Sequence, residues 1–376
     1  MKNRLYISRS SAFRYILIII TFSVLFKIIE AAIGIPISAL LVSYVISIVL
    51  IVIFMKSSIR IEGNISRILL YTLFIYYIFT NCYTISLESA KEKTLFLIYA
   101  DLVPLLIINL FFLFSNNPSK DIFQGQEKLY RISACIIFIL FVLYTIGFTE
   151  SIGNRHMIKG MLNPIWAGRV YAFLSLLVTY YILAYKRYNI INILAVILGI
   201  FLVYTAGTRG PLFAYAIITT LIMWKYSNKV VLLSVLSVFI LIIMLIIENR
   251  GVGAHSSNLG RLDYLYFVLD YWNKTFLGYG IGSFGNLYLN KDVIFYPHNL
   301  ILELYIEGGI PLFAIIIVLF LNFFINFRMN YISISVIFFM INSMLSGDIT
   351  SNNFLFIFLF LNSYIQDNKE QQKLYN

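Results

Sequence analysis

The stretch FYPHNLILELYIEGGIP, residues 295–311, places polar side chains at the head of an apolar run that continues to about residue 327. As one helix, residues 298–327 would be about 45 Å long at ~1.5 Å per residue, whereas the apolar core of a bilayer is only about 30 Å thick. A Gly-Gly-Ile-Pro sequence at 308–311 interrupts the run. The sequence therefore predicts a break there, which separates a short helix over 298–307 from a membrane span.

The short helix carries polar residues for which an ordinary membrane anchor has no use. Asn299, Glu303 and Glu307 are four residues apart and so share one face. His298 stands at the N-terminal tip, directly after Pro297, which suits a helix start. One interpretation is that the polar face turns inward and forms a wall of a binding site. The alternative is a helix cap followed by solvated glutamates, and we favour the binding site.

The composition identifies the class of protein. Sixty per cent of the 376 residues are hydrophobic and only 12% are charged, with a mean hydropathy of +0.87. A soluble chain of this length could not hide so much apolar surface, whereas a polytopic membrane protein exposes it to lipid. The chain is therefore predicted to be an all-α polytopic integral membrane protein.

Charge and cysteine content exclude other classes. The net charge is +11, but the Lys and Arg residues lie mostly in short segments between apolar runs. This pattern indicates membrane topology and contact with membrane lipids, and it argues against nucleic acid as a partner. Cys82 and Cys135 both lie in apolar runs and are predicted to be small buried hydrophobic residues. Two such cysteines form neither a disulfide framework nor a metal site, so the metal prediction is none.

Apolar runs predict about twelve transmembrane helices in a single membrane domain over residues 1–376. The first run resembles part of a signal peptide, but no convincing cleavage site follows, so it is interpreted as a retained span. The bias of positive charge places both termini in the cytoplasm. An external loop over residues 248–308, containing short helices, is the longest segment outside the spans. The predicted spans are 14–33, 36–55, 68–87, 95–114, 131–149, 168–185, 190–206, 210–224, 230–247, 309–327, 331–346 and 352–366.

Arginines on the external side require an explanation, because positive charge is disfavoured there. They belong to three segments, 150–169, 207–210 and 248–308, which this topology opens on one face of the membrane. Arg209 lies in a Gly/Pro-rich break between two spans, where unpaired backbone groups need protein or a water-filled cavity. Contact with lipid headgroups is the alternative explanation. The external arginines are Arg155, Arg169, Arg209, Arg250 and Arg261.

Two further features lie in the external loop. Arg261 opens an aromatic segment in which Tyr264, Phe267 and Tyr271 recur at helical spacing, as expected of a helix in the membrane interface. The sequence GYGIGSFG, residues 278–285, contains G-x-G-x-x-G, but no βαβ pattern surrounds it. A dinucleotide site is therefore rejected, and the glycines are interpreted as a tight turn.

Four pieces of sequence occur in order over roughly residues 150–311: NRHMIKGMLNPIWAGRVYAFL, TAGTRGPL, GRLDYLYFVLDYWNKTFLGYGIGSFGN and HNLILELYIEGGIP. Together they resemble segments of the O-antigen ligase/polymerase-like superfamily of bacterial membrane glycosyltransferases. Before residue 150, only the hydropathy is similar to that family.

The resemblance implies a GT-C-like fold in the bacterial inner membrane, with the active site on the periplasmic face. It implies a donor glycan carried on undecaprenyl pyrophosphate, no nucleotide sugar, no metal and no cofactor. Arg209, Arg261 and His298 fall on functional positions of the family, and Arg155 falls on a less firmly defined one. A chain-length regulator protein is expected as a partner by family analogy alone.

The residues permit a matching mechanism. When the lipid pyrophosphate leaves, negative charge develops on its oxygens. The sequence has no Asp-x-Asp motif that could hold a metal ion to neutralise this charge. Arginine can do so instead, because one guanidinium group donates two parallel hydrogen bonds to phosphate oxygens. Arg209 and Arg261, with Arg155, are expected to hold the donor pyrophosphate. His298 is expected to orient or deprotonate the acceptor hydroxyl, with Glu307 as the reserve base. The further substrate-binding candidates are Arg169, Arg250, Asn299 and Glu303.

Three functions remain open from the sequence. We favour a polymerase of O-antigen or capsular repeat units, because the external loop is short and the turn sequence is Thr-Arg-Gly. An O-antigen ligase, which transfers the glycan to lipid A–core, is the first alternative. A flippase or transporter of lipid-linked glycan is the second, although no internal repeat is visible and the candidate residues gather on one face.

Overall fold

The computed structural model describes residues 64–113, 126–153, 155–161, 163–227, 253–271, 274, 276–347 and 349–367. The predicted spans 14–33, 36–55 and 230–247 lie outside the described residues, as does Arg250. The chain divides into two compact units. Unit 1 comprises residues 1–61 and 106–246, and unit 2 comprises residues 62–105 and 247–376.

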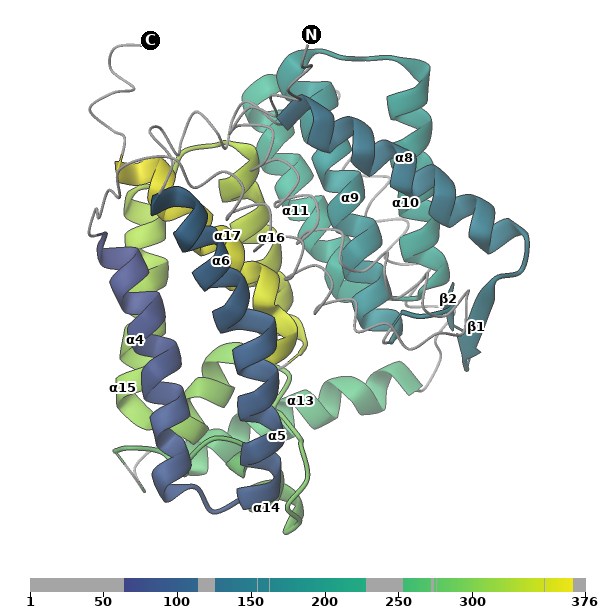
Figure 1. Cartoon of the computed structure of the whole chain (residues 1–376). Helices are drawn as coiled ribbons and strands as arrows, with labels where there is room; N and C mark the ends of the chain where they lie inside the picture. The colour runs from purple at the N-terminus through teal and green to yellow at the C-terminus, as the bar shows by residue number, and fades with distance from the viewer. Residues whose placement is uncertain are drawn as a thin grey trace, which may run out of the picture. The chain divides into compact units, whose positions relative to one another are not determined.

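Unit 1 is built around helix α9 (Pro164–Tyr185), which is buried along most of its length. Helices α8 (Gln126–Thr145), α10 (Ile190–Thr205) and α11 (Arg209–Tyr226) pack against it (Figure 1). Small residues allow this close approach, as at Gly199 of α10, where an added Cβ would lie 1.9 Å from Ser175 Oγ. A hairpin of β1 (Thr149–Ile152) and β2 (Arg155–Ile158) lies between α8 and α9 in the chain.

Unit 2 contains α4 (Ile65–Phe79), the first helix of the described residues, and the helices from α13 onward. Helix α4 buries Leu70, Leu73, Phe74 and Tyr77, a helical stripe that packs on α15 (Leu300–Ile325) and α17 (Asn353–Asp367). A 3₁₀ turn, η1 (Thr80–Tyr83), follows α4. The remaining helices are α5 (Leu87–Leu97), the π-helical turn η2 (Ile98–Leu102), α6 (Val103–Leu113), which continues across the boundary of the units, α13 (Gly253–Asp270), α14 (Ser283–Leu289), α16 (Tyr331–Leu345) and the 3₁₀ turn η3 (Thr350–Asn352).

The helices support a polytopic membrane protein. Within the described residues, five helical segments are long and apolar enough to cross a membrane: Ile65–Tyr83, Leu87–Leu110, Gln126–Thr145, Pro164–Tyr185 and Leu300–Ile325. Shorter apolar helices occur at Ile190–Thr205, Tyr331–Leu345 and Asn353–Ile365. The count of twelve spans and the single domain over residues 1–376 stay predictions.

Three details differ from the sequence-based expectation. The predicted all-α fold contains a two-stranded hairpin, where β1 pairs with β2 shortly after α8 ends at Thr145. Helix α5 begins at Leu87, eight residues before the predicted span at 95, because its first two turns are amphipathic and escape a search for apolar runs. The prediction that Cys82 and Cys135 are buried is wrong: both are free and exposed. On α8 the buried stripe includes Ala134 and Ile137, so Cys135 points away from it.

The predicted break in the segment 298–327 is confirmed. Helix α15 starts after its cap, Asn299, and its regular geometry is interrupted at Gly309, where φ is 67° and ψ is −160°. The short helical piece before Gly309 and the apolar piece after it are therefore two helices joined by a kink. This break sets the position of the short helix that follows His298.

Candidate functional site

In unit 1, the hairpin that carries Arg155 is fixed on helix α9. Met157 and Ile158 of β2 are buried, and the Ile158 N–H donates to the Tyr171 hydroxyl oxygen of α9 at 3.3 Å. Arg155 opens β2 and is half-buried. Burial lowers the pKa of Arg155, and the positive charge of Arg209 lowers it further. The structure thus brings these two predicted site residues within electrostatic reach of each other.

The turn before Arg209 lies against α9. Gly207 takes a positive φ of 60°, and Arg209 is then the first residue of α11. Gly168 of α9 approaches Thr208 so closely that an added Cβ would lie 1.9 Å from Thr208 Oγ1. Arg169, the next residue of α9, is only 4% exposed. Arg169 therefore neighbours the turn that leads into Arg209, and three of the predicted arginines gather at one end of unit 1.

This arrangement is electrostatically unfavourable by itself. The N-terminus of a helix carries partial positive charge, so a cation in the first turn of α11 opposes the helix dipole. Among the described residues, neither Arg155 nor Arg209 forms an ion pair. An anion bound here would compensate both guanidinium groups and the partial positive charge of the helix N-terminus. The geometry therefore suits a phosphate-bearing ligand.

In unit 2, His298 is held in an unusual backbone conformation. Its φ of 55° lies in the left-handed region, which costs a non-glycine residue about 1–2 kcal/mol. Asn299 fixes the position that follows: its Oδ1 accepts from the N–H groups of Ile301 at 3.0 Å and Leu302 at 3.2 Å. The Asn299 amide also donates to the Met344 carbonyl at 3.2 Å. Asn299 is thus observed as the cap of α15.

Aromatic rings connect His298 with helix α13. The His298 ring centroid lies 4.9 Å from that of Tyr296 and 6.0 Å from that of Tyr264. Burial raises the pKa of Tyr264, as do Tyr288 and Asp263, whereas the positive charge of Arg261 lowers it. Arg261 is exposed one helical turn before Tyr264. The structure therefore places Arg261 and His298 around the same tyrosine.

The predicted amphipathic aromatic segment is a helix, and its rings pack inside unit 2. Tyr264, Phe267 and Tyr271 of α13 surround a core of Val268, Phe284, Tyr305 and Ile306. Exposed side chains remain on the same helix, including Leu262 at 49% and Tyr266 at 62%. A place for α13 in the membrane interface stays a prediction.

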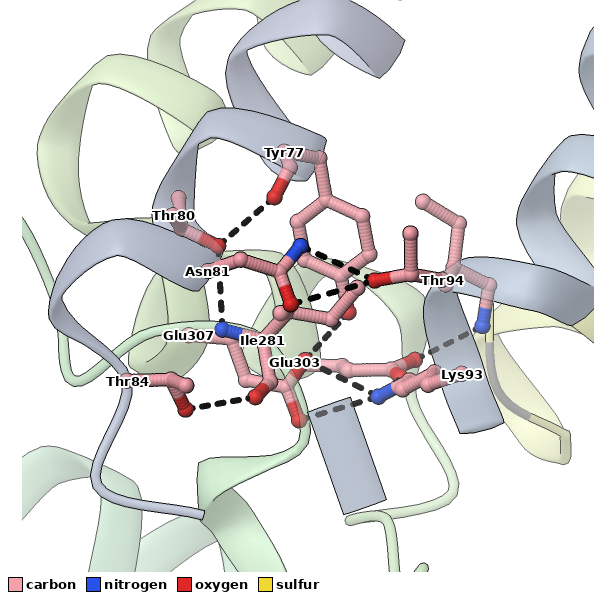
Figure 2. Close-up of polar contacts among 10 residues, drawn as sticks. Tyr77, Thr80, Asn81, Thr84, Lys93, Thr94, Ile281, Glu303 and Glu307 are labelled. Carbon is pink, nitrogen blue, oxygen red and sulfur yellow. Dashed lines mark hydrogen bonds and ion pairs between the residues drawn. The ribbon is translucent and has the colours of Figure 1, made fainter. Parts of the chain in front are cut away.

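Glu303 and Glu307 have no exposed surface. Both form ion pairs with Lys93 of α5, and Lys93 Nζ lies 2.9 Å from each carboxylate oxygen of Glu307 (Figure 2). The Tyr77 hydroxyl of α4 donates to Glu307. The polar face is thus turned inward, as predicted, but its glutamates meet a buried lysine. The sequence did not single out either partner, because Lys93 lies in the connection between the predicted spans 68–87 and 95–114 and Tyr77 lies within the first of these spans.

The glycine-rich segment 276–280 supplies backbone partners for the break in α15. The Tyr279 N–H donates to the Ile306 carbonyl at 3.0 Å, and the Gly280 N–H donates to the Glu307 carbonyl at 2.8 Å. In return, the Ile310 N–H donates to the Phe276 carbonyl at 3.0 Å. Gly278 has a φ of 81°, and an added Cβ would lie 2.5 Å from Gly309 N. The glycines therefore form a turn that allows two backbones to meet, which confirms their predicted role.

The residues that follow this glycine-rich segment are bound to the connection between α4 and α5. The Thr80 hydroxyl accepts from the Ile281 N–H at 2.9 Å, and the Thr84 hydroxyl donates to the Ile281 carbonyl at 2.8 Å (Figure 2). Asp292 accepts from the N–H groups of Glu88 at 3.0 Å and Ser89 at 3.1 Å, at the N-terminus of α5. The part of the loop that leads to His298 is therefore an ordered layer over α4 and α5.

Comparison with known proteins shows a similarity over about a third of the chain. Residues 194–317 match the family model described as O-antigen ligase. This match confirms the predicted resemblance to the O-antigen ligase/polymerase-like superfamily, whose members are glycosyltransferase-like enzymes. No curated protein and no solved structure matches the chain.

The matched segment separates the site residues into two groups. Arg209, Arg250, Arg261, His298, Asn299, Glu303 and Glu307 lie inside residues 194–317 of the match. Arg155, Arg169 and Lys93 lie before it, so the match does not support them, and of the three only Lys93 was found from the structure. Among the described residues, no group of three or more His, Cys, Asp or Glu side chains could hold a metal ion.

Proposed function

We propose that this protein is a polysaccharide polymerase of the inner membrane. It would join oligosaccharide repeat units of O-antigen or capsule that are carried on undecaprenyl pyrophosphate, with the active site on the periplasmic face. The observation that carries the proposal is the match of residues 194–317, because this segment contains Arg209, Arg261 and His298.

The arginines of unit 1 would bind the pyrophosphate of the donor. Arg155 and Arg209 share an electrostatic environment at the N-terminus of α11, where an anion relieves their mutual repulsion. As the bond between C1 of the sugar and the phosphate oxygen breaks, both bonding electrons stay with the pyrophosphate. Guanidinium groups fixed near that oxygen stabilise the developing charge. Arg169 of the same unit would add positive charge toward this ligand. The family resemblance alone extends the expected donor-binding set to Arg261 and to Arg250, which lies outside the described residues.

His298 would act on the acceptor. A hydroxyl of the next repeat unit forms the new bond to C1, and its proton moves to the imidazole of His298. The proton leaves to water, and undecaprenyl pyrophosphate is released. The contacts of the half-buried His298 ring with Tyr296 and Tyr264 support a defined orientation for this step. Glu307 is fully buried against Lys93. Of its two predicted roles, we therefore favour support of His298 over that of a reserve base. Asn299 would support His298 from the adjacent cap position.

Ligation is the second candidate, because the matched family model is described as O-antigen ligase. The donor and the roles of the arginines would be unchanged, whereas the acceptor hydroxyl would belong to lipid A–core. The short external loop and the Thr-Arg-Gly turn favour the polymerase.

A glycan gel separates the candidates. In a strain deleted for this gene, a polymerase defect leaves core bearing a single repeat unit, and wild type but not His298→Ala restores the ladder. Bare core with long lipid-linked chains would instead identify a ligase. Accumulation of lipid-linked units on the cytoplasmic face would identify a flippase and refute the glycosyltransferase.

The role of the arginines has its own test. Arg209→Lys and Arg261→Lys keep the charge but lose the paired donors of guanidinium, so each should reduce polymer formation at least about a hundredfold. Lys91→Arg, at an exposed position of α5, serves as the control and should leave the ladder unchanged. Normal ladders from both lysine variants would refute the role of guanidinium in binding pyrophosphate.

A further inference from the structure

A buried group of charges lies inside unit 2, away from any water-exposed surface. Lys93 of α5 is 1% exposed, and Glu303 and Glu307 of α15 are not exposed at all. Lys93 Nζ contacts both oxygens of Glu307 at 2.9 Å and also forms an ion pair with Glu303 (Figure 2). Tyr77 donates to Glu307, and the Ile349 N–H donates to the second oxygen of Glu303 at 2.9 Å. One ammonium group therefore joins two carboxylates that are one helical turn apart.

Such a group is a poor way to stabilise a fold. Burying charges requires their desolvation, and well-packed apolar residues of similar volume often stabilise a protein equally well. A hydrogen-bonded ion pair instead restricts how two helices lie against each other, because its partners must meet at fixed distances and angles. The residues around Lys93 show that an apolar side chain would suit the position, since Ala90 and Leu97 occupy the same buried face of α5. A geometric role explains Lys93 better than a purely stabilising one.

The piece of structure that Lys93 holds begins at His298. Glu303 lies in the first turns of α15, and its N–H donates to the Asn299 carbonyl at 3.0 Å. Asn299 caps the helix and directly follows His298, whose left-handed backbone persists only if its surroundings determine it. On the other side, the break at Gly309 removes the support that a continuous helix would give. The short helix is thus held by its cap, by the glycine-rich segment and by Lys93.

We propose that Lys93 is a positioning residue of the transfer reaction. Its ion pairs with Glu303 and Glu307 fix the axial position and rotation of the short helix over residues 300–308, and thereby the orientation of His298. Lys93 acts through this helix and does not touch the substrate. The inference rests on the proposed function, because it assigns a role in the reaction that His298 performs.

The test compares Lys93→Met with the triple variant Lys93→Met/Glu303→Gln/Glu307→Gln. The single variant leaves two buried carboxylates uncompensated and is expected to fold poorly, whereas the triple variant is neutral and should fold. Lys91→Met is the matched control, because Lys91 is exposed on the same helix. Activity is measured on purified full-length protein in micelles with lipid-linked repeat units and is expressed per folded molecule.

The triple variant should have a kcat at least about tenfold below wild type, because a displacement of the general base near 1 Å has effects of this size or larger. Its KM for the lipid-linked donor should stay within about twofold, because pyrophosphate binding is assigned to other residues. Lys91→Met should match wild type in both constants. A wild-type kcat in the folded triple variant would overturn the proposal and leave Lys93 a structural residue.

A second measurement does not depend on activity. Diethyl pyrocarbonate modifies accessible imidazole, and mass spectrometry gives the rate at each histidine. The rate at His298 should change in the triple variant and stay constant in Lys91→Met, with the exposed His156 as the internal reference. If wild type forms no polymer, the proposed function fails, while a changed rate at His298 still supports positioning. An unchanged rate at His298 refutes positioning whatever the activity.

Discussion

Replacing Gly309 with alanine should destabilise unit 2 severely. Gly309 has a φ of 67° and a ψ of −160°, a backbone region that is essentially reserved for glycine. A side chain in such a region costs about 1–3 kcal/mol from backbone strain alone. This term applies wherever the backbone adopts that conformation, whether or not space exists for the methyl group.

At Gly309 there is no space either. The added Cβ would lie 2.1 Å from the Phe276 carbonyl oxygen and 2.5 Å from the Leu277 carbonyl carbon. These backbone atoms can move only if the bond from the Ile310 N–H to the Phe276 carbonyl, at 3.0 Å, is lost. Overpacking adds about 1–3 kcal/mol and the lost hydrogen bond about 1 kcal/mol. The expected total of about 3–7 kcal/mol is comparable with the whole stability of many domains.

Two other glycines separate these terms. Gly153 has a φ of 61° with nothing within 4 Å of an added Cβ, so Gly153→Ala should show strain alone, about 1–2 kcal/mol. Gly260 of α13 has ordinary geometry, with Tyr264 Oη 3.7 Å away, so Gly260→Ala should be neutral or stabilise by up to about 1 kcal/mol. Unfolding of the purified variants by SDS titration in micelles gives the ranking. The reasoning is refuted if Gly309→Ala unfolds at the same SDS fraction as Gly153→Ala.

Two further predictions concern helix caps in unit 2. Although partial burial opposes it, hydrogen bonds from Ser89 and Glu88 hold the pKa of Asp292 below its ordinary value. The stabilisation by this depressed carboxyl is complete above the unfolded pKa of about 3.9 and is lost as pH falls through the folded value. Asp292→Ala should therefore lower the free energy of unfolding by about 1 kcal/mol at neutral pH. In thermal melts, the difference in stability between wild type and variant should shrink below about pH 4. A difference that stays constant with pH would contradict this account of the cap. Asn299→Ala and Asn330→Ala each remove a cap and should cost about 1 kcal/mol, but only the former should reduce polymer formation, since Asn330 caps α16. If the two variants form equal amounts of polymer, the Asn299 cap does not contribute to the function of His298.

Local signals in the sequence predicted much of the fold. The break in α15 was predictable because glycine and proline interrupt a helix wherever they occur, and a run of about thirty residues exceeds the bilayer core. The turn formed by Gly278 and Gly280 was predictable for the same reason, since it depends on backbone freedom at those positions. The four-residue spacing of Glu303 and Glu307 correctly placed both on one inward face, whereas Asn299 is the cap that precedes the helix.

Interactions between distant residues were not predictable in this way. Lys93 meets Glu307 across 214 positions of the chain, and no local pattern specifies that pairing. A signal did exist, because Lys93 recurs at helical spacing with the buried Ala90 and Leu97. An apolar-run criterion overlooked it, since the start of α5 also contains Glu88, Lys91 and Glu92. The proximity of Arg155 to Arg209 likewise required the hairpin, which a twelve-span interpretation treated as part of a connection.

The stretch 295–311 therefore contains two kinds of polar residue with different exposure. His298, which precedes the helix, is half-exposed and can meet a substrate, whereas Glu303 and Glu307 lie within it and are sealed from water. Charged groups at such depth persist when they have partners, and Lys93 and Tyr77 are partners from outside the matched family segment. The helix that follows His298 is consequently fixed by α4 and α5, which precede it by more than 200 residues. Variation in α4 and α5 is then expected to alter the proposed transfer activity even though no role in the reaction itself is assigned to a residue of either helix.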